Sequence, residues 1–245
     1  VYTDYDDNKY LPNPERFFNP RYNQLASNEW KYNLSYVKIN LETHEVRNAD
    51  GRVLKTPIDI DYSKAHCEIW DTAWRGAGVP PAVALDEHDN PVFLHVLSED
   101  SLTDHRYYYV HRIGDEWKKT PITHSNHQWN SGYLHRDRDG VLHAFVVVGE
   151  GYLEGGYMDK HGGGRIEEWV SSDQGNHWSK LRDVSPTADR YAGWRFNNVQ
   201  PAVRPDGSPV DGMLLFYGWK HEGEPDATAF LLHETAHQQV SHPNK

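Results

Sequence analysis

The sequence of 245 residues contains a single cysteine, Cys67, and only two methionines. One cysteine excludes a disulfide within the chain. Hydrophobic residues make up only 37% of the chain, and no apolar run reaches the roughly 18 residues that a membrane-spanning helix needs. The chain begins Val1-Tyr2-Thr3 without a methionine or a signal sequence. We interpret this start as the removal of a leader or as a piece of a longer protein.

Basic residues are also scarce. The chain has 25 Lys and Arg against 36 Asp and Glu, which gives a formal net charge of −11. Such a charge argues against nucleic acid and anionic membranes as partners. It does not exclude an anionic sugar, because a few local arginines or lysines can offset the overall field.

Aromatic residues are plentiful by contrast: they reach 13% of the chain, with nine Trp and fifteen Tyr. Disordered chains are poor in aromatics, so the sequence predicts a folded protein. The combination of few aliphatic and many aromatic residues favours a β-protein with short strands and an aromatic-lined polar groove.

No stretch shows a convincing helical period, and a strand, Asp-rich turn, strand unit recurs instead. The three copies start at Pro81, Gly132 and Pro201, and each is followed by a second pair of strands. Four strands in a period of about 50 residues is the signature of propeller blades. We predict an all-β propeller with about four blades, around residues 1–57, 77–122, 130–185 and 196–245. Four blades is the lower limit for closure, so we expect this chain to be the later half of a larger propeller.

The segment from Ser171 to Trp178 has the form S-x-D-x-G-x-x-W, the Asp-box. Asp173 can accept backbone N–H groups within the turn, and Gly175 supplies a positive φ at little cost. We expect Trp178 to fold back and bury its ring against the hairpin. The motif's chemistry is that of a turn, so it marks the fold and not a substrate site.

Asn33 to Ile58 resembles the blade of BNR-repeat proteins that ends W-x-N-A-D-G-x-x-L-x-x-P-I, with Val46 in place of the usual Trp. Together with the Asp-box, the chain resembles the later blades of BNR-type polysaccharide lyases, of which the ulvan lyases have a seven-bladed propeller. The resemblance implies a secreted or periplasmic lyase that cleaves a uronate-containing polysaccharide such as ulvan by β-elimination. The family's catalytic His pair has no clear counterpart in this chain.

Near the start, two residues could reach the active site that the resemblance implies. Tyr2 would correspond to a family tyrosine close to the sugar, and Arg21 could clamp a carboxylate with its bidentate fork. Both are predicted as catalytic, with the neighbouring Tyr22 and Asn23, and with Trp129, as substrate-binding residues. Trp194 and Trp219 are further candidate platforms for sugar rings, unless these tryptophans belong to the core.

A second constellation consists of His66, Cys67, His124 and His127. One thiolate and two or three imidazoles could hold a structural Zn²⁺ (or, less suitably, Ca²⁺) that staples adjacent blades. The alternative is a buried free thiol with surface histidines. Catalysis by the implied route requires no cofactor.

Two other functions remain open from the sequence. A sialidase-type glycoside hydrolase would need an arginine triad, and the arginines here do not fall at matching blade positions. A non-catalytic carbohydrate-binding propeller is the second alternative. His95 and His143 are interpreted as equivalent positions at the ends of second strands with a shared structural role.

Overall fold

The computed structural model describes residues 1–6, 18–26, 30–149, 162–206, 208–220, 227–233 and 236–239, with the backbone only for residues 5, 6, 211 and 236–239. Parts of the predicted blades 1–57, 130–185 and 196–245 therefore lie outside the described residues. Across the described part of the chain, no helix is long and apolar enough to span a membrane.

The structure is built from four four-stranded antiparallel sheets. The first contains β1 (Tyr2–Asp6), β4 (Trp30–Ser35), β7 (Glu68–Trp70) and β8 (Gly76–Ala77); the second contains β9 (Ala82–Leu85), β10 (Pro91–Ser98), β11 (His105–Ile113) and β12 (Glu116–Ser125). The third contains β13 (Gly132–Arg136), β14 (Leu142–Val148), β15 (Arg165–Ser171) and β16 (Ser179–Asp183); the fourth contains β17 (Trp194–Val203), β18 (Pro209–Lys220), β19 (Thr228–His233) and β20 (Ala236–Gln239).

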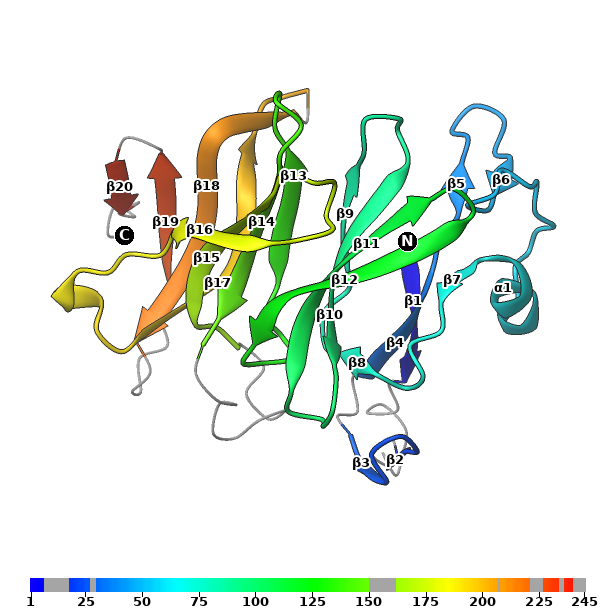
Figure 1. Cartoon of the computed structure of the whole chain (residues 1–245), viewed down its shortest axis with the longest axis horizontal. Helices are drawn as coiled ribbons and strands as arrows, with labels where there is room; N and C mark the ends of the chain where they lie inside the picture. Colours follow the sequence, from blue (N-terminus) through cyan, green and yellow to red (C-terminus); the bar gives the residue numbers. More distant parts are fainter. Residues whose placement is uncertain are drawn as a thin grey trace, which may run out of the picture.

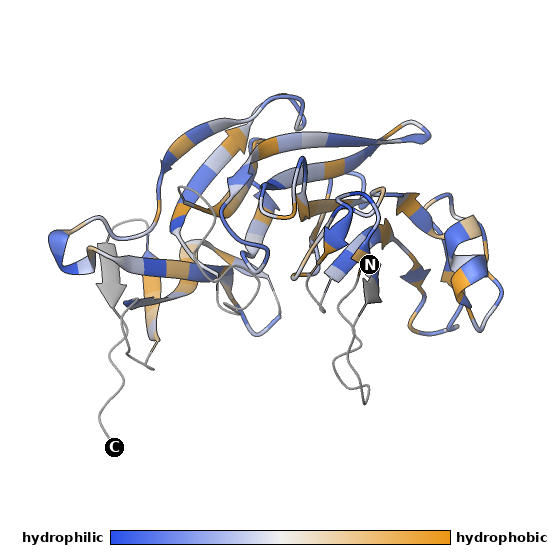
Figure 2. Cartoon of the chain, turned by 90° about the horizontal axis from the view of Figure 1, so that it is seen from below, coloured by the Kyte–Doolittle hydropathy of each residue, from blue (hydrophilic) through white to orange (hydrophobic). Residues whose placement is uncertain are grey.

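The second, third and fourth sheets are each a simple meander, in which every strand pairs with the next one along the chain. The innermost strands β9, β13 and β17 contact one another in succession. Figure 2 shows the sheets following one another along an arc, and Figure 1 places the first and fourth sheets at opposite ends of the molecule. The prediction of an all-β propeller is confirmed.

The core lies between neighbouring sheets, because alternate residues of a strand face opposite neighbours. On β10, Phe93 and Leu97 pack toward the first sheet, in a cluster with Leu34 and Trp70. Leu94 and Val96, which alternate with them along β10, pack toward the third sheet, in a cluster that includes Leu134. A third cluster joins the third and fourth sheets through Ile166 and Phe216, among others. The central strands are therefore buried on both faces.

Two of the three Asp-rich turns that marked the repeat, those at Asp86 and Asp137, share one construction. The Asp86 carboxylate accepts the backbone N–H groups of His88 and Asn90, both at 2.8 Å. In the next sheet, the Asp137 carboxylate likewise accepts the backbone N–H groups of the residues two and four positions later, Asp139 and Val141. Asp side chains favour such turns because they replace a missing backbone partner. This shared construction also sets the register of the two repeats.

That register shows that His95 and His143 are not equivalent, contrary to the sequence interpretation. Asp86 and Asp137 occupy matching places, so His143 matches Val92, six residues after the Asp in each case. His95 lies three residues further along its strand and faces the first sheet, fully buried. Neighbouring side chains of a strand point to opposite faces, so an offset of three residues places His95 and His143 on opposite faces of their sheets.

The Asp-box forms the turn between β15 and β16. Ser171 Oγ donates to Asp173 Oδ1 and accepts the Gly175 N–H, and Asp173 also accepts the His177 N–H. The Trp178 ring reaches beyond its own hairpin and contacts Tyr109 of the neighbouring sheet at 5.5 Å between ring centroids. The motif thus ties two sheets together.

The first sheet is the least regular, and it extends further along the chain than the predicted blade of residues 1–57. It takes in β7 and β8, beyond residue 57, and these follow a helix, α1 (Ile60–His66). The Asp59 carboxylate caps the helix by accepting the Tyr62 N–H at 2.8 Å. A helix of seven residues is too short to show a period, so its absence from the sequence interpretation has a simple reason. Two small hairpins, β2–β3 (Phe18–Asn19, Gln24–Leu25) and β5–β6 (Lys38–Ile39, Val46–Arg47), complete the described strands, and a single turn of 3-10 helix, η2 (Asp189–Tyr191), precedes β17.

Candidate functional site

One edge of the molecule, which we call the loop rim, carries most of the predicted substrate residues. It consists of the β2–β3 hairpin and the loops 71–75, 99–104 and 126–131, and it lies at the lower edge of Figure 1. The Asp-box lies at the other end of its sheet, since Ser171 is opposite Leu142 while Arg165 is opposite Val148.

The β2–β3 hairpin is anchored on the rim by two residues. The Tyr22 hydroxyl hydrogen-bonds to Ser98 Oγ and to the carbonyl oxygen of Glu99, both at 2.9 Å. The fully buried Asn19 donates to the carbonyl of Trp74 and accepts the Arg21 N–H. Burial raises the pKa of Tyr22, against the hydrogen bond with Ser98 and the charge of Arg21. Tyr22 therefore positions the hairpin.

The turn of this hairpin presents Arg21 and Asn23 to solvent. Both side chains are exposed, and Asn23 holds a positive φ of 52°, which asparagine tolerates better than most residues. The Arg21 guanidinium lies 5.7 Å from the centre of the Tyr22 ring. A guanidinium on an anchored turn can bind a carboxylate through two parallel hydrogen bonds.

Trp129 lies on the same rim, partly buried. Its ring faces Lys31, whose Nζ lies 5.4 Å from the ring centre and donates to the carbonyl of Gly78 at 2.6 Å. A Cβ at Gly78 would lie 2.7 Å from this ring, so the tryptophan packs directly on backbone. Of the other two candidate platforms, the partly buried Trp194 packs against a hydrophobic core cluster, and Trp219 stacks on Tyr217 with an Arg195 guanidinium over it.

The loop 99–104, which holds the Tyr22 hydroxyl through the Glu99 carbonyl, also pairs with an exposed histidine near the end of β12, His124. The Glu99 N–H donates to the Asp104 carbonyl at 2.7 Å, so the two ends of the loop meet. Asp104 pairs with His124 Nδ1 at 3.3 Å and with Arg106 at 3.1 Å. The His124 side chain is 68% exposed. Burial would raise the pKa of Asp104, but the hydrogen bond and charge of Arg106 outweigh it and leave the pKa low. Asp104 thus remains an anion that can orient the imidazole.

Beneath the hairpin lies an ionic cluster that the sequence did not suggest. Arg75 donates to Glu99 Oε2 at 2.6 Å, and Tyr108 donates to the same oxygen. Burial would raise the pKa of Glu99, but the Tyr108 hydrogen bond and the charge of Arg75 hold the pKa below its usual range. Burial followed by the Glu99 hydrogen bond raises the pKa of Tyr108. The cluster joins the first sheet to the second and supports the loop that carries Tyr22.

The floor of the rim is a network of buried amides. Asn130 Nδ2 donates to Asn126 Oδ1 at 2.7 Å, and Asn130 Oδ1 accepts the Gly163 N–H at 2.6 Å. Asn197 Oδ1 accepts the Ser131 N–H, and its Nδ2 donates to the Trp129 carbonyl. These bonds hold the loops of the third and fourth sheets rigidly against one another.

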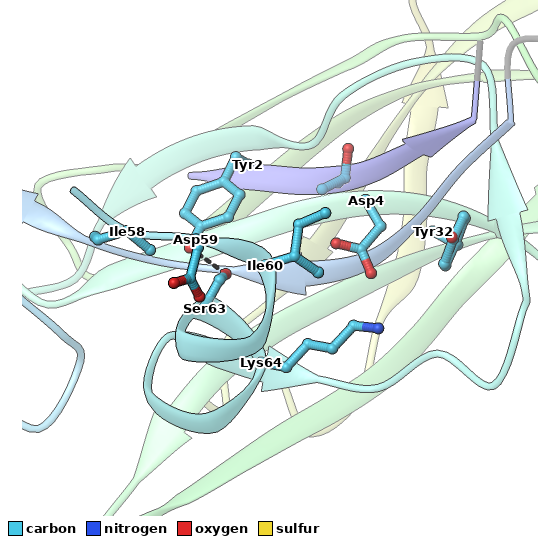
Figure 3. Close-up of a pocket in the computed structure, with 9 residues that line it drawn as sticks. Tyr2, Asp4, Tyr32, Ile58, Asp59, Ile60, Ser63 and Lys64 are labelled. Carbon is cyan, nitrogen blue, oxygen red and sulfur yellow. Dashed lines mark hydrogen bonds between the residues drawn. The ribbon is translucent and has the colours of Figure 1, made fainter. Parts of the chain in front are cut away.

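Tyr2 lies away from the rim, in a cavity of about 550 Å³ between β1, β4 and α1 (Figure 3). Its hydroxyl hydrogen-bonds to Ser63 Oγ at 2.6 Å. Burial raises its pKa, with smaller effects from Ser63 and Cys67. Tyr2 is opposite Ser35 on β4, whereas Asp6 is opposite Trp30, whose Nε1 donates to the same Trp74 carbonyl as Asn19.

The structure therefore separates the two predicted catalytic residues. The hairpin that carries Arg21 lies at the Asp6 end of β1, and Tyr2 lies about 13 Å along the strand from Asp6, at about 3.3 Å per residue. Tyr22, Asn23, Trp129 and Arg21 do share the rim; Tyr2 does not join them.

The four predicted metal ligands are not brought together either. Among the described residues, no group of three or more His, Cys, Asp or Glu side chains is placed to hold a metal ion. His66 contacts the Tyr62 ring at 4.4 Å on α1, and Cys67 follows it, buried and free. His124 lies on the rim, and His127 is fully buried with its Nδ1 accepting the Trp129 N–H. The spacing in sequence suggested ligands, but the pairs belong to different sheets.

No protein-family model matches the chain. No curated protein matches it either. Among solved structures, it is similar to a polysaccharide lyase of the family PL25, an ulvan lyase, with a TM-score of 0.65 and 14% identity over 89% of this chain and 46% of that one.

The same lyase bound to -[GlcA(1-4)Rha3S]- gives a TM-score of 0.65 and 14% identity over 91% of this chain and 46% of that chain. An intramolecular trans-sialidase from Ruminococcus gnavus gives a TM-score of only 0.39 at 14% identity, over 90% of this chain and 54% of that one, too low to indicate a common fold. The likeness to the lyase shows a shared fold, and the chain spans about half the length of that protein (46%).

Proposed function

We propose that this protein is a polysaccharide lyase that acts on a uronate-containing, acidic polysaccharide, of which ulvan is the first candidate, by β-elimination at the loop rim. The observation that carries the proposal is the exposed Arg21 on a hairpin anchored to the loop 99–104, the same loop whose Asp104 pairs with the exposed His124, in a fold shared with an ulvan lyase.

The chemistry follows from the charges on the rim. Arg21 would bind the uronate carboxylate in a bidentate fork and offset its charge, which acidifies the proton on the adjacent carbon. His124, oriented by Asp104, would accept that proton as an imidazole. The electron pair of the broken C–H bond forms a carbon–carbon double bond, and the glycosidic C–O bond breaks. The departing oxygen takes a proton from the imidazolium or from water, so atoms and charges balance.

This step needs no metal, because the guanidinium supplies the positive charge. A structural zinc or calcium ion remains a separate proposal, and it would require Cys67 to bind the metal with residues other than His124 and His127, which lie apart from it. Its test is metal analysis of the purified protein and of a Cys67→Ser variant. Zinc in the wild-type protein that is lost in the variant would support it, and equal, negligible zinc in both would contradict it. A secreted or periplasmic location fits a polymer substrate, and it too remains a proposal.

Mass spectrometry of the digestion products tests the elimination. A lyase gives oligosaccharides with an unsaturated end, lighter by one water than the products of hydrolysis. Products without this deficit would indicate a hydrolase of the sialidase type. Retention on the polysaccharide without any product would indicate a binding module, the second candidate.

The matched variants are His124→Ala and His88→Ala. Both histidines are exposed, but His88 lies on the turn after β9, away from the rim. We expect His124→Ala to slow product formation by about 100-fold, the usual contribution of a general base, while His88→Ala leaves it unchanged. Equal rates in the two variants would remove His124 from the proposal.

A further inference from the structure

A hollow of about 260 Å³ lies at the opposite ends of the strands from the loop rim. It is lined by β11, by the β9–β10 and β13–β14 turns and by the Asp-box turn, and we call it the turn hollow. The β9–β10 and β13–β14 turns lie at the upper edge of Figure 1. One end of β10, at Pro91, adjoins the β9–β10 turn, and the other end, at Ser98, adjoins the loop 99–104. At roughly 3.3 Å per residue, this strand separates the two places by about 23 Å.

Alternate residues of β11 form one wall of the turn hollow. Tyr109, His111 and Ile113 all line it, since side chains two positions apart on a strand point to the same face. The Tyr109 and His111 rings lie 4.7 Å apart with an angle of 38° between them. Leu142 of β14 adds an aliphatic side chain. The hollow therefore offers the aromatic and aliphatic surface that packs well against the C–H face of a sugar ring.

The Asp-box fixes the position of this wall. The Trp178 ring contacts the Tyr109 ring at 5.5 Å between centroids, and Gly175 packs so closely on Tyr109 that a Cβ there would clash with it. Tyr109 is only 3% exposed. The exposed Gln174, on the same turn, also lines the hollow. A wall that is already ordered lowers the cost of binding a ligand.

His111 brings an unused nitrogen to the turn hollow. The residue is 7% exposed, and its Nε2 has no hydrogen-bond partner among the described residues. A buried polar atom without a partner costs free energy, which a bound hydroxyl group would recover. Burial, helped by the charge of Asp86, raises the pKa of Tyr109, so its hydroxyl stays protonated and can donate.

The imidazole of His111 calls for a neutral partner. Burial, followed by the charge of Lys118, lowers the pKa of His111, so the ring is uncharged at neutral pH. A neutral imidazole nitrogen either donates or accepts, depending on the tautomer. A hydroxyl group does both, so it can pair with either tautomer.

The charged side chains that line the turn hollow already have partners. Arg136 donates to the carbonyl of Gly140 at 3.2 Å and pairs with Glu87. The Asp86 carboxylate accepts the N–H groups of its own turn, and Arg112 pairs with Asp50 at 2.7 Å, on the side of the first sheet. His88 lies 3.6 Å from Glu87 and is 74% exposed. A charged ligand would therefore find no counterion in want of a partner.

We propose that the turn hollow is a second carbohydrate site, which binds one neutral sugar ring through packing on Tyr109 and hydroxyl hydrogen bonds to His111 and Tyr109. This inference goes beyond the elimination proposed at the loop rim and does not depend on it. The hollow, at about 260 Å³, lies just below the range of drug-sized sites, which begins near roughly 300 Å³. It therefore suits a single ring rather than a length of chain.

Nitrogen-15 NMR of the histidine side chains tests this site. The protein is titrated with methyl β-D-glucoside, a neutral sugar ring, and with methyl β-D-glucuronide, the same ring with a carboxylate. We expect the glucoside to shift the imidazole signals of His111, which are identified by their absence from His111→Phe. The glucoside should bind His111→Phe and Tyr109→Phe about fivefold more weakly than the wild-type protein, since each variant loses about one net hydrogen bond. The glucuronide should bind no more tightly than the glucoside.

The matched control is Tyr36→Phe. Tyr36 is a partly buried tyrosine that packs on Phe93 and lines a different hollow, so its variant should bind the glucoside like the wild-type protein. Equal affinities of His111→Phe and Tyr36→Phe would overturn the proposal. So would unchanged His111 signals with both sugars, as expected of a hollow that holds only water.

Tighter binding of the glucuronide would overturn the neutral class of ligand. The thermal transition of each variant checks its folding, and Tyr109→Phe, which removes a single oxygen atom, decides if His111→Phe does not fold. Elimination at the loop rim is judged separately, by its unsaturated products, so either proposal can fail without the other.

Discussion

The histidines of this protein differ in pKa and hydrogen bonding because their neighbours differ. His95 is fully buried, and neither ring nitrogen has a hydrogen-bond partner among the described residues. His143 forms two hydrogen bonds with carboxylates: its Nδ1 lies 2.7 Å from Glu168 Oε1, and its Nε2 lies 3.3 Å from Asp137 Oδ2. The hydrogen bond with Glu168 raises the pKa of His143 despite burial, whereas burial lowers the pKa of His95 to about 3. The His124 side chain is 68% exposed and pairs with one carboxylate, that of Asp104, and it is in this setting that we propose a proton-accepting role for it.

The lowered pKa of His95 predicts a loss of stability in acid. The pKa of His95 is near the ordinary value of 6.5 in the unfolded chain and about 3 in the folded protein, so the unfolded chain takes up the proton first as pH falls. The contribution of neutral His95 to the unfolding free energy is therefore complete above about pH 6.5. It is lost as pH falls, by up to about 1.4 kcal/mol per pH unit. We expect His95→Leu to flatten the acid side of the urea-denaturation free energy between about pH 6.5 and pH 4. An unchanged slope in His95→Leu, compared with a His88→Leu control, would contradict this.

Arg21 provides the second test at this scale. A bidentate fork on a carboxylate cannot be replaced by an ammonium group, which makes a point contact. We expect Arg21→Lys to lose about tenfold or more in kcat/KM and Arg21→Ala about 100-fold, without a change in thermal stability, because the side chain is exposed. Arg138→Lys, a conservative change at a site outside the rim, is the control. If Arg21→Lys retains full activity, the carboxylate clamp is wrong.

At the scale of elements, the turns were the features that could be predicted from the sequence. The Asp86 and Asp137 turns and the Asp-box are local, so three or four residues suffice to specify each of them. The helix α1 was not predicted because its seven residues show no hydrophobic period. It is stabilised instead by the Asp59 cap and by the ring contact between Tyr62 and His66. The turn hollow was not predicted because β11 meets the Asp-box only through the packing of the second sheet on the third. The separation of Tyr2 from Arg21 likewise depends on the pairing of β1 with β4.

The Asp-box glycine gives a prediction about sheet packing. Gly175 and Gly51 have nearly equal φ values, 83° and 78°, but a Cβ at Gly175 would lie 2.2 Å from the Tyr109 ring, while one at Gly51 would meet nothing within 4 Å. We expect Gly51→Ala to cost about 1 kcal/mol in unfolding free energy, from φ alone. Gly175→Ala should cost about 3 kcal/mol, because overpacking is added. Equal costs in chemical denaturation would show that the contact with Tyr109 is unimportant.

At the scale of the whole molecule, the repeat of strand, Asp turn and strand was enough to predict a propeller of four-stranded sheets. The arc of sheets brings together loops that are far apart in the sequence: the loop 99–104 holds the hairpin of Arg21 through Tyr22 and pairs with His124 through Asp104. The predicted four-ligand metal cluster did not form, because spacing along the chain says little about which sheets lie side by side. The further sheets expected from a larger propeller remain a proposal.

We propose that residues of the loop rim remove a proton beside a uronate carboxylate. The ultraviolet absorbance of the conjugated double bond that elimination creates can be followed while the purified chain is incubated with ulvan. We expect a steady rise in absorbance that is abolished when the uronates are reduced to neutral sugars and is strongly slowed in Arg21→Ala. New reducing ends without any rise in absorbance would contradict it.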